Sequence, residues 1–376
     1  MKIRVFKTII LLTVASALIQ GKCAQTDVID SVFAGAIPAG KQCYIIGEVH
    51  LDQELPVQES INMIAQTAIA EDSLRKFLVT ERGVNHFMLE LPTCNGYFVR
   101  EYINTGDETW IAFFKTNTYM YARIKNLRAQ KLINNAVSIT CVDINYPQDA
   151  ERTLFALLTL AFYDHYSVVY YPPYNTVVAK PVSADLNIAI SIMQTDTLNI
   201  TPELRQFFTE LIIILTQQSA NATMVHNLIT GTYSNAGLIK ALQKFYATGW
   251  PEVKLIMDGY LAGFEYKTIN SKMLTDRDSL LTSTINEIIK HTKGDTYCLQ
   301  LGDIHSRTND AQNDVKSNLE SKLGLTTYSI HLVPQTFATR LQNIYHPDMP
   351  YDFNFTGIFK LRITNSDNCD MLILNR

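Results

Sequence analysis

The residues QCYIIGEVH (42–50) combine a short apolar run with a loop that contains glycine, glutamate and histidine. The residues TYCLQLGDIH (296–305) repeat this arrangement near the other end of the chain. A short apolar run of this kind is typical of a buried strand in a parallel sheet. Because the carboxyl ends of parallel strands open into one crevice, the two loops predict a shared site that contains His50 and His305.

Alternating strand and helix signals extend from the first of these runs. Residues 42–47, 84–91 and 137–144 predict strands, and apolar positions at helical spacing predict helices over 55–80 and 104–131. This β-α-β-α-β order is typical of a parallel sheet that is covered by helices.

The middle of the chain interrupts the alternation with a long helical stretch. Apolar stripes predict helices over 150–166, 202–218, 236–247, 251–266 and 271–291. We interpret residues from about 150 to 270 as a helical insertion, or lid, that is attached to the sheet.

The last part of the chain returns to the α/β pattern. Residues 296–301 and 328–333 predict strands on either side of a helix at about 310–323, and residues 355–363 and 371–374 predict an antiparallel pair at the sheet edge. The predicted fold class is therefore α/β, with a mostly parallel central sheet flanked by helices and with a helical insertion.

The amino terminus follows a different pattern. Basic residues precede the short apolar run of residues 8–19, and small or polar residues follow it. A secretory signal peptide has this organisation, whereas a membrane span needs about 20 apolar residues. We therefore expect residues 1–24 to be a signal peptide, residues 25–376 to form a single α/β domain, and the mature protein to be exported, either periplasmic or secreted. Lipid anchoring at Cys23 is the alternative, although Lys22 fits a lipidation signal poorly.

Composition limits the classes of partner. The 376 residues are 47% hydrophobic and 18% charged, with a formal net charge of −4, so the chain can bury a large core and offers no broad basic field for nucleic acid. No transmembrane segment is expected in the mature chain. Cys43, Cys141 and Cys298 lie within predicted strands, where free cysteine packs as a small apolar side chain.

Polar residues end the predicted strands. Glu48 and His50 follow the first strand, and Glu90 and Asp143 end the next two. Buried polar groups are costly without partners, so we expect these side chains to pair with one another, with a ligand or with a metal. A purely structural histidine remains the alternative for His50, as do caps or hydrogen-bond acceptors for Glu48 and Asp143. A further histidine, His86, lies within a strand and is interpreted as a packed residue.

The run Ile45-Ile46-Gly47-Glu48-Val49-His50, the strand end Met88-Leu89-Glu90 and the loop Leu301-Gly302-Asp303-Ile304-His305 resemble motifs of one superfamily. This superfamily joins erythromycin esterases, ChaN-like haem-binding lipoproteins and Tiki-type proteases. The helix around Arg277 resembles the Arg-Asp helix that precedes the last histidine motif of the esterases. The similarity extends over the α/β framework from about residue 42 to residue 335.

In the esterase branch the resemblance implies a histidine general base that activates water, with glutamates and a second histidine around it. By motif match these catalytic roles fall on Glu48, His50, Glu90 and His305. The chain has Glu-x-His where those enzymes have Glu-x-x-His, and Leu51 replaces the glycine after the histidine. The shorter spacing is nearer to the ChaN-like branch. The pair of Gly-x-x-His loops is nearer to the Tiki branch, where a divalent metal is implied.

Three chemistries fit these residues. A neutral imidazole can take a proton from water, and Asp143 and Arg277 are candidate substrate-binding residues beside it. With a divalent metal, His50, Glu90 and His305 would be ligands that lower the pKa of bound water. A haem- or ligand-binding protein is the non-enzymatic alternative, in which the aromatic residues 163–174 line the pocket. The other interpretation of these aromatic residues is that they simply pack against helices or loops. The expected partner is a small-molecule or peptide substrate, and the sequence fixes neither the substrate nor the oligomeric state.

Overall fold

The computed structural model describes most of the chain. The described residues are 33–48, 71–170, 183–217, 221–268, 274–292, 294–302, 314–334, 361–366 and 369–375. His50, Asp303, His305 and the expected signal peptide lie outside the described residues.

The described strands form one seven-stranded sheet in the order β3-β2-β4-β1-β5-β7-β6. The strands are β1 (Cys43–Glu48), β2 (His86–Pro92), β3 (Ser138–Asp143), β4 (Tyr297–Gly302), β5 (Thr327–Pro334), β6 (Leu361–Ser366) and β7 (Cys369–Asn375). Every neighbouring pair is parallel except β6 and β7, which are antiparallel. The mostly parallel sheet and its antiparallel edge pair are therefore as predicted.

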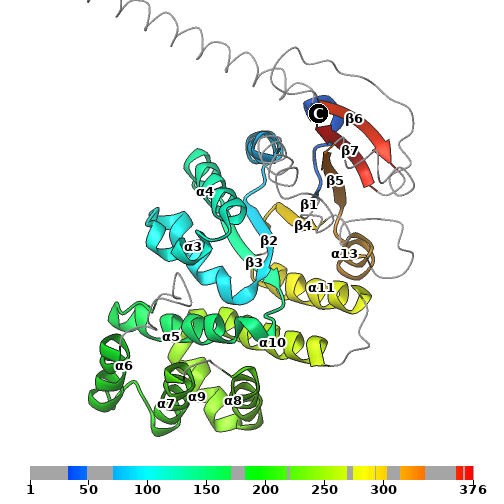
Figure 1. Cartoon of the computed structure of the whole chain (residues 1–376). Helices are drawn as coiled ribbons and strands as arrows, with labels where there is room; N and C mark the ends of the chain where they lie inside the picture. Colours follow the sequence, from blue (N-terminus) through cyan, green and yellow to red (C-terminus); the bar gives the residue numbers. More distant parts are fainter. Residues whose placement is uncertain are drawn as a thin grey trace, which may run out of the picture.

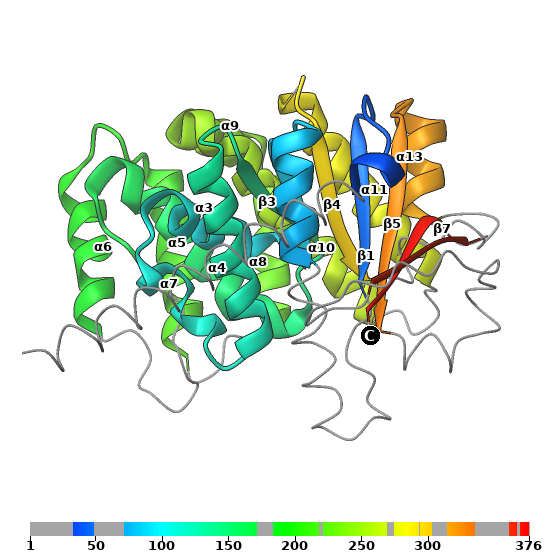
Figure 2. The same ribbon diagram turned by 90° about the horizontal axis from the view of Figure 1, so that it is seen from above.

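Helices cover both faces of the sheet (Figures 1 and 2). The helical residues 71–81, α3 (Gly96–Thr105) and α4 (Thr118–Ile133) lie on one face, and α11 (Leu274–His291) and α13 (Val315–Leu323) lie on the other. Alternation along the strands explains both layers: Ile46 packs into the core of the first face, and Ile45 packs into the core of the second.

The long connection from β3 to β4 contains the helical region. Its helices are α5 (Ala150–Tyr166), α6 (Ser183–Thr195), α7 (Pro202–Thr216), α8 (Ala222–Ser234), α9 (Ala236–Tyr246) and α10 (Trp250–Thr268), and α11 follows them. Short 3₁₀ helices lie at η1 (Thr93–Asn95), η2 (Glu108–Phe114), η3 (Pro147–Asp149) and η4 (Ala247–Gly249). Figures 1 and 2 show α5, α6 and α7 beyond the β3 edge, with β7 toward the opposite edge. Among the described residues 150–268 no strand occurs.

Two glycines attach this helical region to the sheet. Gly259 and Gly263 of α10 face the segment around Asn145, directly after β3. The backbone N–H of Asn145 donates to the carbonyl of Gly259 at 3.0 Å, and its side chain donates to the carbonyl of Ile256 at 2.8 Å. A methyl group on Gly263 would lie 2.1 Å from the carbonyl oxygen of Asn145. Only glycine allows so close an approach, so α10 is tightly docked beside the end of β3.

The fold class is thus confirmed as α/β with a mostly parallel sheet, flanking helices and a helical region between β3 and β4. Cys43, Cys141 and Cys298 are buried and free, as expected. The helices α3, α6 and α8 were not expected from the sequence. No helix in the described parts of the chain combines the length and apolar character needed to cross a membrane.

Candidate functional site

Four neighbouring strands place polar groups at the carboxyl edge of the sheet. In sheet order these are Asp143 at the end of β3, Glu90 near the end of β2, the backbone of Gly302 at the end of β4 and Glu48 at the end of β1. Because all four strands are parallel, the groups lie on the same edge although long stretches of sequence separate them. These four groups therefore lie along one edge of the sheet, and the cavity that they are expected to share with His50 and His305 stays a prediction.

The boundary between β2 and β4 is a switch point of the sheet. The chain leaves β2 toward β3 on one side, and it leaves β4 toward β5 on the other. Ligands of open α/β sheets bind in the crevice outside such a boundary. Glu90 bridges it, because its Oε2 atom accepts a hydrogen bond from the backbone N–H of Gly302.

Arg277, in the first turn of α11, joins two of the predicted site residues. Its Nη2 atom lies 2.5 Å from Oε1 of Glu90 and 2.7 Å from Oδ2 of Asp143. Its Nε atom also donates to Oδ1 of Asp143, at 3.2 Å. The Arg277 side chain is 17% exposed and both carboxylates are nearly buried, so this is an ion-pair cluster with little access to water. Arg277 therefore faces the crevice rather than the surface.

The electrostatics of this cluster follow from burial and close charges. Burial raises the pKa of Asp143, and Glu90 adds to the rise while Arg277 opposes it. Burial lowers the pKa of Arg277, but the charges of Asp143 and Glu90 outweigh it and hold that pKa above its usual range. Burial, and then the charge of Asp143, raise the pKa of Tyr146, whose ring centre lies 6.0 Å from the guanidinium of Arg277. Arg277 is thus a fixed cation.

Glu48 belongs to a second cluster on the other side of the sheet. It forms an ion pair with Arg123 of α4, and Nη2 of Arg123 lies 3.1 Å from Oε1 of Glu71. Glu71 also pairs with Arg75, whose Nε atom donates to the Gln300 side chain of β4 at 3.3 Å. All five side chains are buried. Buried charges are costly unless they are paired in this way, so the network gives Glu48 a cationic partner at the end of β1.

The two clusters are linked through β4. Gly302 is the register partner of Glu48, and its N–H donates to Glu90. The end of β4 therefore lies between the carboxylates of Glu90 and Asp143 on one side and the carboxylate of Glu48 on the other. A substrate group at this edge would meet three acidic strand ends, two of which pair with Arg277 and one with Arg123.

Of the three expected metal ligands, the structure describes only Glu90. Both carboxylate oxygens of Glu90 accept hydrogen bonds, one from Arg277 and one from Gly302. A fixed guanidinium at 2.5 Å also repels a cation at that carboxylate. Within the described residues no group of three or more His, Cys, Asp or Glu side chains is arranged to hold a metal ion.

Four of the predicted site residues lie among the described residues. Glu90, Asp143 and Arg277 form one cluster, and Glu48 lies at the end of the next strand but one from Glu90. His50 and His305 lie outside the described residues, so their roles stay predictions. Sequence reasoning missed Arg123, which pairs with Glu48. The signal that could have found it is the excess of acidic residues at the predicted strand ends, since buried carboxylates require cationic partners.

Comparisons with known proteins give only distant structural matches. No protein-family model matches the chain, and no curated protein is significantly similar in sequence. Similar solved structures include an erythromycin esterase. This structure, a mutant of EreC in its open conformation, has a TM-score of 0.45 and 10% identity, and the match covers 92% of this chain and 78% of that one.

Two further solved structures are similar to the chain. A succinoglycan biosynthesis protein has a TM-score of 0.47 and 11% identity, with 89% of this chain and 88% of that chain covered. A protein from Bacillus cereus has a TM-score of 0.41 and 11% identity, with coverages of 78% and 66%. At TM-scores of 0.41 to 0.47 and identities of 10 to 11%, these likenesses assign no role to any residue of this chain.

Proposed function

We propose that this chain is an exported hydrolase in which a His/Glu constellation at the carboxyl edge of the sheet activates water. The observation that supports this proposal is the cluster of Glu90, Asp143 and Arg277 at the switch point between β2 and β4. Both histidine loops continue directly from the strands that end at this edge, because β1 leads to His50 and β4 leads to His305.

In the proposed reaction His50 acts as the general base. A neutral imidazole takes a proton from water, and the carboxylate of Glu48, two residues earlier, stabilises the imidazolium that forms. Glu90 and His305 complete the pocket. Arg277 holds Glu90 and Asp143 in place.

The contacts of Glu90 favour this direct mechanism over a metal-assisted one. A metal ligand needs a carboxylate oxygen directed at the ion, whereas the oxygens of Glu90 accept hydrogen bonds from Arg277 and Gly302. The adjacent guanidinium adds charge repulsion against a cation. We therefore propose hydrolysis without a metal bound to Glu90.

The described aromatic residues of the 163–174 stretch pack within the helical region. The ring of Tyr163 lies 5.3 Å from that of Trp110, and Tyr170 is buried against Phe162. The hydroxyl of Tyr166 donates to Asp196 at 2.8 Å. These contacts match the packing interpretation of the stretch, so the hydrolase is preferred to the haem-binding alternative.

The test is a panel of carboxylic esters assayed with the mature chain. We expect His50→Ala to lower kcat/KM by a factor of about 10² to 10⁴, the usual contribution of a general base. His226→Ala is the matched control, because His226 of α8 stacks on Phe264 of α10 and does not follow a strand of the sheet. Equal activity of His50→Ala and the wild type would contradict the proposal.

Metal dependence and haem binding are measured on the same preparations. We expect a chelator to leave the ester activity unchanged. We also expect haem addition to give no Soret band that depends on His50 or His305. Loss of activity with the chelator, restored by a divalent metal, would replace the direct mechanism by the metal-assisted one. For export, the expected result is a mature amino terminus near residue 25 in protein recovered from outside the cytoplasm.

A further inference from the structure

A second cluster of hydrogen-bonded polar residues lies toward the amino-terminal ends of β2 and β3. His86 of β2 contacts Asp295 through Nδ1 at 3.2 Å and Thr140 of β3 through Nε2 at 2.9 Å. The register explains the second contact: His86 pairs with Ser138 and Met88 pairs with Thr140, so His86 and Thr140 are diagonal neighbours on one face. The carboxylate, the imidazole and the hydroxyl are connected in the order of a catalytic triad.

The carboxylate of Asp295 in this cluster is itself held in place. Its other oxygen, Oδ1 of Asp295, accepts a hydrogen bond from the Asn85 side chain at 3.0 Å. The Oδ1 atom of Asn85 accepts one from the backbone N–H of Thr296 at 2.9 Å. His86 is only 3% exposed, and its ring lies 5.7 Å from the ring of Tyr297. Such support fixes the tautomer in which Nδ1–H donates to Asp295 and Nε2 accepts from Thr140.

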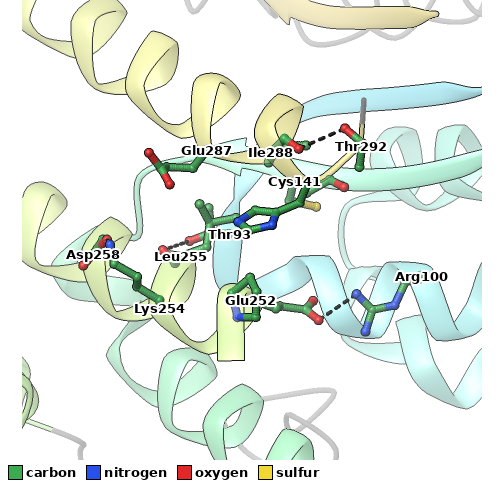
Figure 3. A pocket seen from close by; sticks show the side chains of 13 residues that line it. Thr93, Arg100, Cys141, Glu252, Lys254, Leu255, Asp258, Glu287, Ile288 and Thr292 are labelled. Carbon is green, nitrogen blue, oxygen red and sulfur yellow. Dashed lines mark hydrogen bonds and ion pairs between the residues drawn. The ribbon is translucent and has the colours of Figure 1, made fainter. Parts of the chain in front are cut away.

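A cavity adjoins Thr140 of this cluster. Thr140 lines it together with residues of α10 and of the carboxyl end of α11, among them Leu255 and Ile288 (Figure 3). The cavity volume is about 170 Å³. A cavity of ~150 Å³ holds a benzene molecule, so a small acyl group of similar size fits.

The charged side chains around the cavity are paired. Nη1 of Arg100 lies 2.7 Å from Oε2 of Glu252, as Figure 3 shows, and Lys254 pairs with Asp258. Paired charges leave little net field for an ionic ligand, whereas the apolar walls favour a neutral one.

We propose that Thr140, His86 and Asp295 form a second nucleophilic site, which takes small neutral carboxylic esters into the adjoining cavity. Oγ1 of Thr140 attacks the carbonyl carbon as its proton moves to Nε2 of His86, and the ester C–O bond breaks as that proton passes to the leaving alcohol. Water then attacks the acyl-threonine, and the products are the carboxylic acid and the free hydroxyl of Thr140. Asp295 orients His86 throughout.

The state of His86 suits this role. Burial lowers the pKa of His86, and Asp295 opposes this effect only in part, so the imidazole is the neutral base near physiological pH. This site is separate from the hydrolase site proposed above, because Glu90 lies near the carboxyl end of β2 and His86 begins that strand.

The experiment uses phenyl acetate with the His50→Ala variant, so that failure of the first proposal does not affect it. We expect a burst of phenol and one acetyl group on Thr140, located by peptide mass spectrometry after rapid acid quenching. Thr140→Val abolishes the adduct, and His86→Gln slows its formation by a factor of about 10² to 10⁴. Thr140→Ser keeps the adduct, now on the serine.

Thr195→Val is the control, since Thr195 is an exposed residue of α6 whose hydroxyl donates within its own helix, to the carbonyl oxygens of Ser191 at 2.8 Å and of Ile192 at 3.4 Å. It should leave the burst unchanged. Absence of acetyl from Thr140 in the parent chain would overturn the proposal, as would an equal burst in a folded Thr140→Val variant. If Thr140→Val does not fold, the peptide map of the parent and of Thr140→Ser gives the answer.

Discussion

Arg277 contacts Asp143 through two nitrogen atoms, with Nη2 2.7 Å from Oδ2 and Nε 3.2 Å from Oδ1. This bidentate pair joins the start of α11 to the end of β3. It therefore attaches the last helix of the long helical connection to the strand after which that connection begins. Bidentate arginine–carboxylate pairs are more specific in direction than single contacts. The same contact therefore orders the candidate site and fixes the end of the helical region.

Replacement of Arg277 by methionine should strongly destabilise the fold. The change leaves Glu90 and Asp143 as buried carboxylates without their cation, and breaking a buried pair in this way costs about 3 to 5 kcal/mol. Urea unfolding at pH 7 measures the loss. Lys290→Met is the control, because its partner Glu287 is exposed and surface pairs contribute about 0 to 1 kcal/mol. A loss for Arg277→Met no larger than for Lys290→Met would contradict the cluster.

The cost of Arg277→Met should also depend on pH. Burial already raises the pKa of Asp143, and loss of Arg277 removes the charge that opposes this rise. A carboxyl with a raised pKa in the folded state contributes stability below its unfolded pKa of 3.8, and this contribution is lost as pH rises through the folded pKa. The gap between wild type and variant should therefore be smaller at pH 4 than at pH 7. Unfolding midpoints that stay equally far apart at both pH values would exclude this explanation.

Gly263→Ala should loosen the contact between α10 and the sheet. The added methyl would lie 2.1 Å from the carbonyl oxygen of Asn145, a backbone atom that cannot move away cheaply. Overpacking of this kind costs about 1 to 3 kcal/mol. Gly231→Ala in α8 is the matched control: nothing lies within 4 Å of its new methyl, so it should gain up to about 1 kcal/mol from helix propensity. Thermal unfolding of the two variants decides the point, and a shift of the same sign in both would count against the close approach.

The sequence predicted the residues that end the strands but not the order of the strands. Glu48, Glu90 and Asp143 could be assigned to one edge because parallel strands share a direction, whatever their order. The insertion of β4 between β2 and β1 depends on which helix packs on which face, a contact between residues far apart in the chain. For the same reason the Gly302–Glu90 hydrogen bond could not be predicted.

Missed elements have a local cause. The helix α3 contains aromatic and β-branched residues that weaken helix propensity, and α8 contains threonines and Gly231. Burial of Phe98 in α3 and Ile229 in α8 outweighs these preferences in the fold. Arg123 was missed because a basic residue within a helix is usually solvated, and only the packing of α4 over the end of β1 buries it.

His86 predicts a specific dependence of stability on acid. Its pKa is lowered in the folded state by burial, so its contribution to stability is present above the unfolded pKa of 6.5 and is lost as pH falls through the folded pKa. The wild type should lose stability between pH 7 and pH 5, and His86→Gln should lose less. Denaturant unfolding at the two pH values measures this difference, with His226→Ala as the control. A pH response that is the same in His86→Gln and in the wild type would show that His86 does not carry it.

Arg123 and Glu48 should show strong energetic coupling. Removal of Arg123 alone leaves Glu48 and Glu71 buried without a shared cation, and removal of the Glu48 charge alone leaves an arginine that still pairs with Glu71. We expect Arg123→Met to cost about 3 to 5 kcal/mol. The double variant Glu48→Gln/Arg123→Met should recover part of that cost, because one buried carboxylate is then neutral. A double-mutant cycle measured by urea unfolding gives the coupling energy directly. Strictly additive single effects would mean that Glu48 does not pair with Arg123 in solution. The Arg123 network would then not hold the strand end that precedes His50.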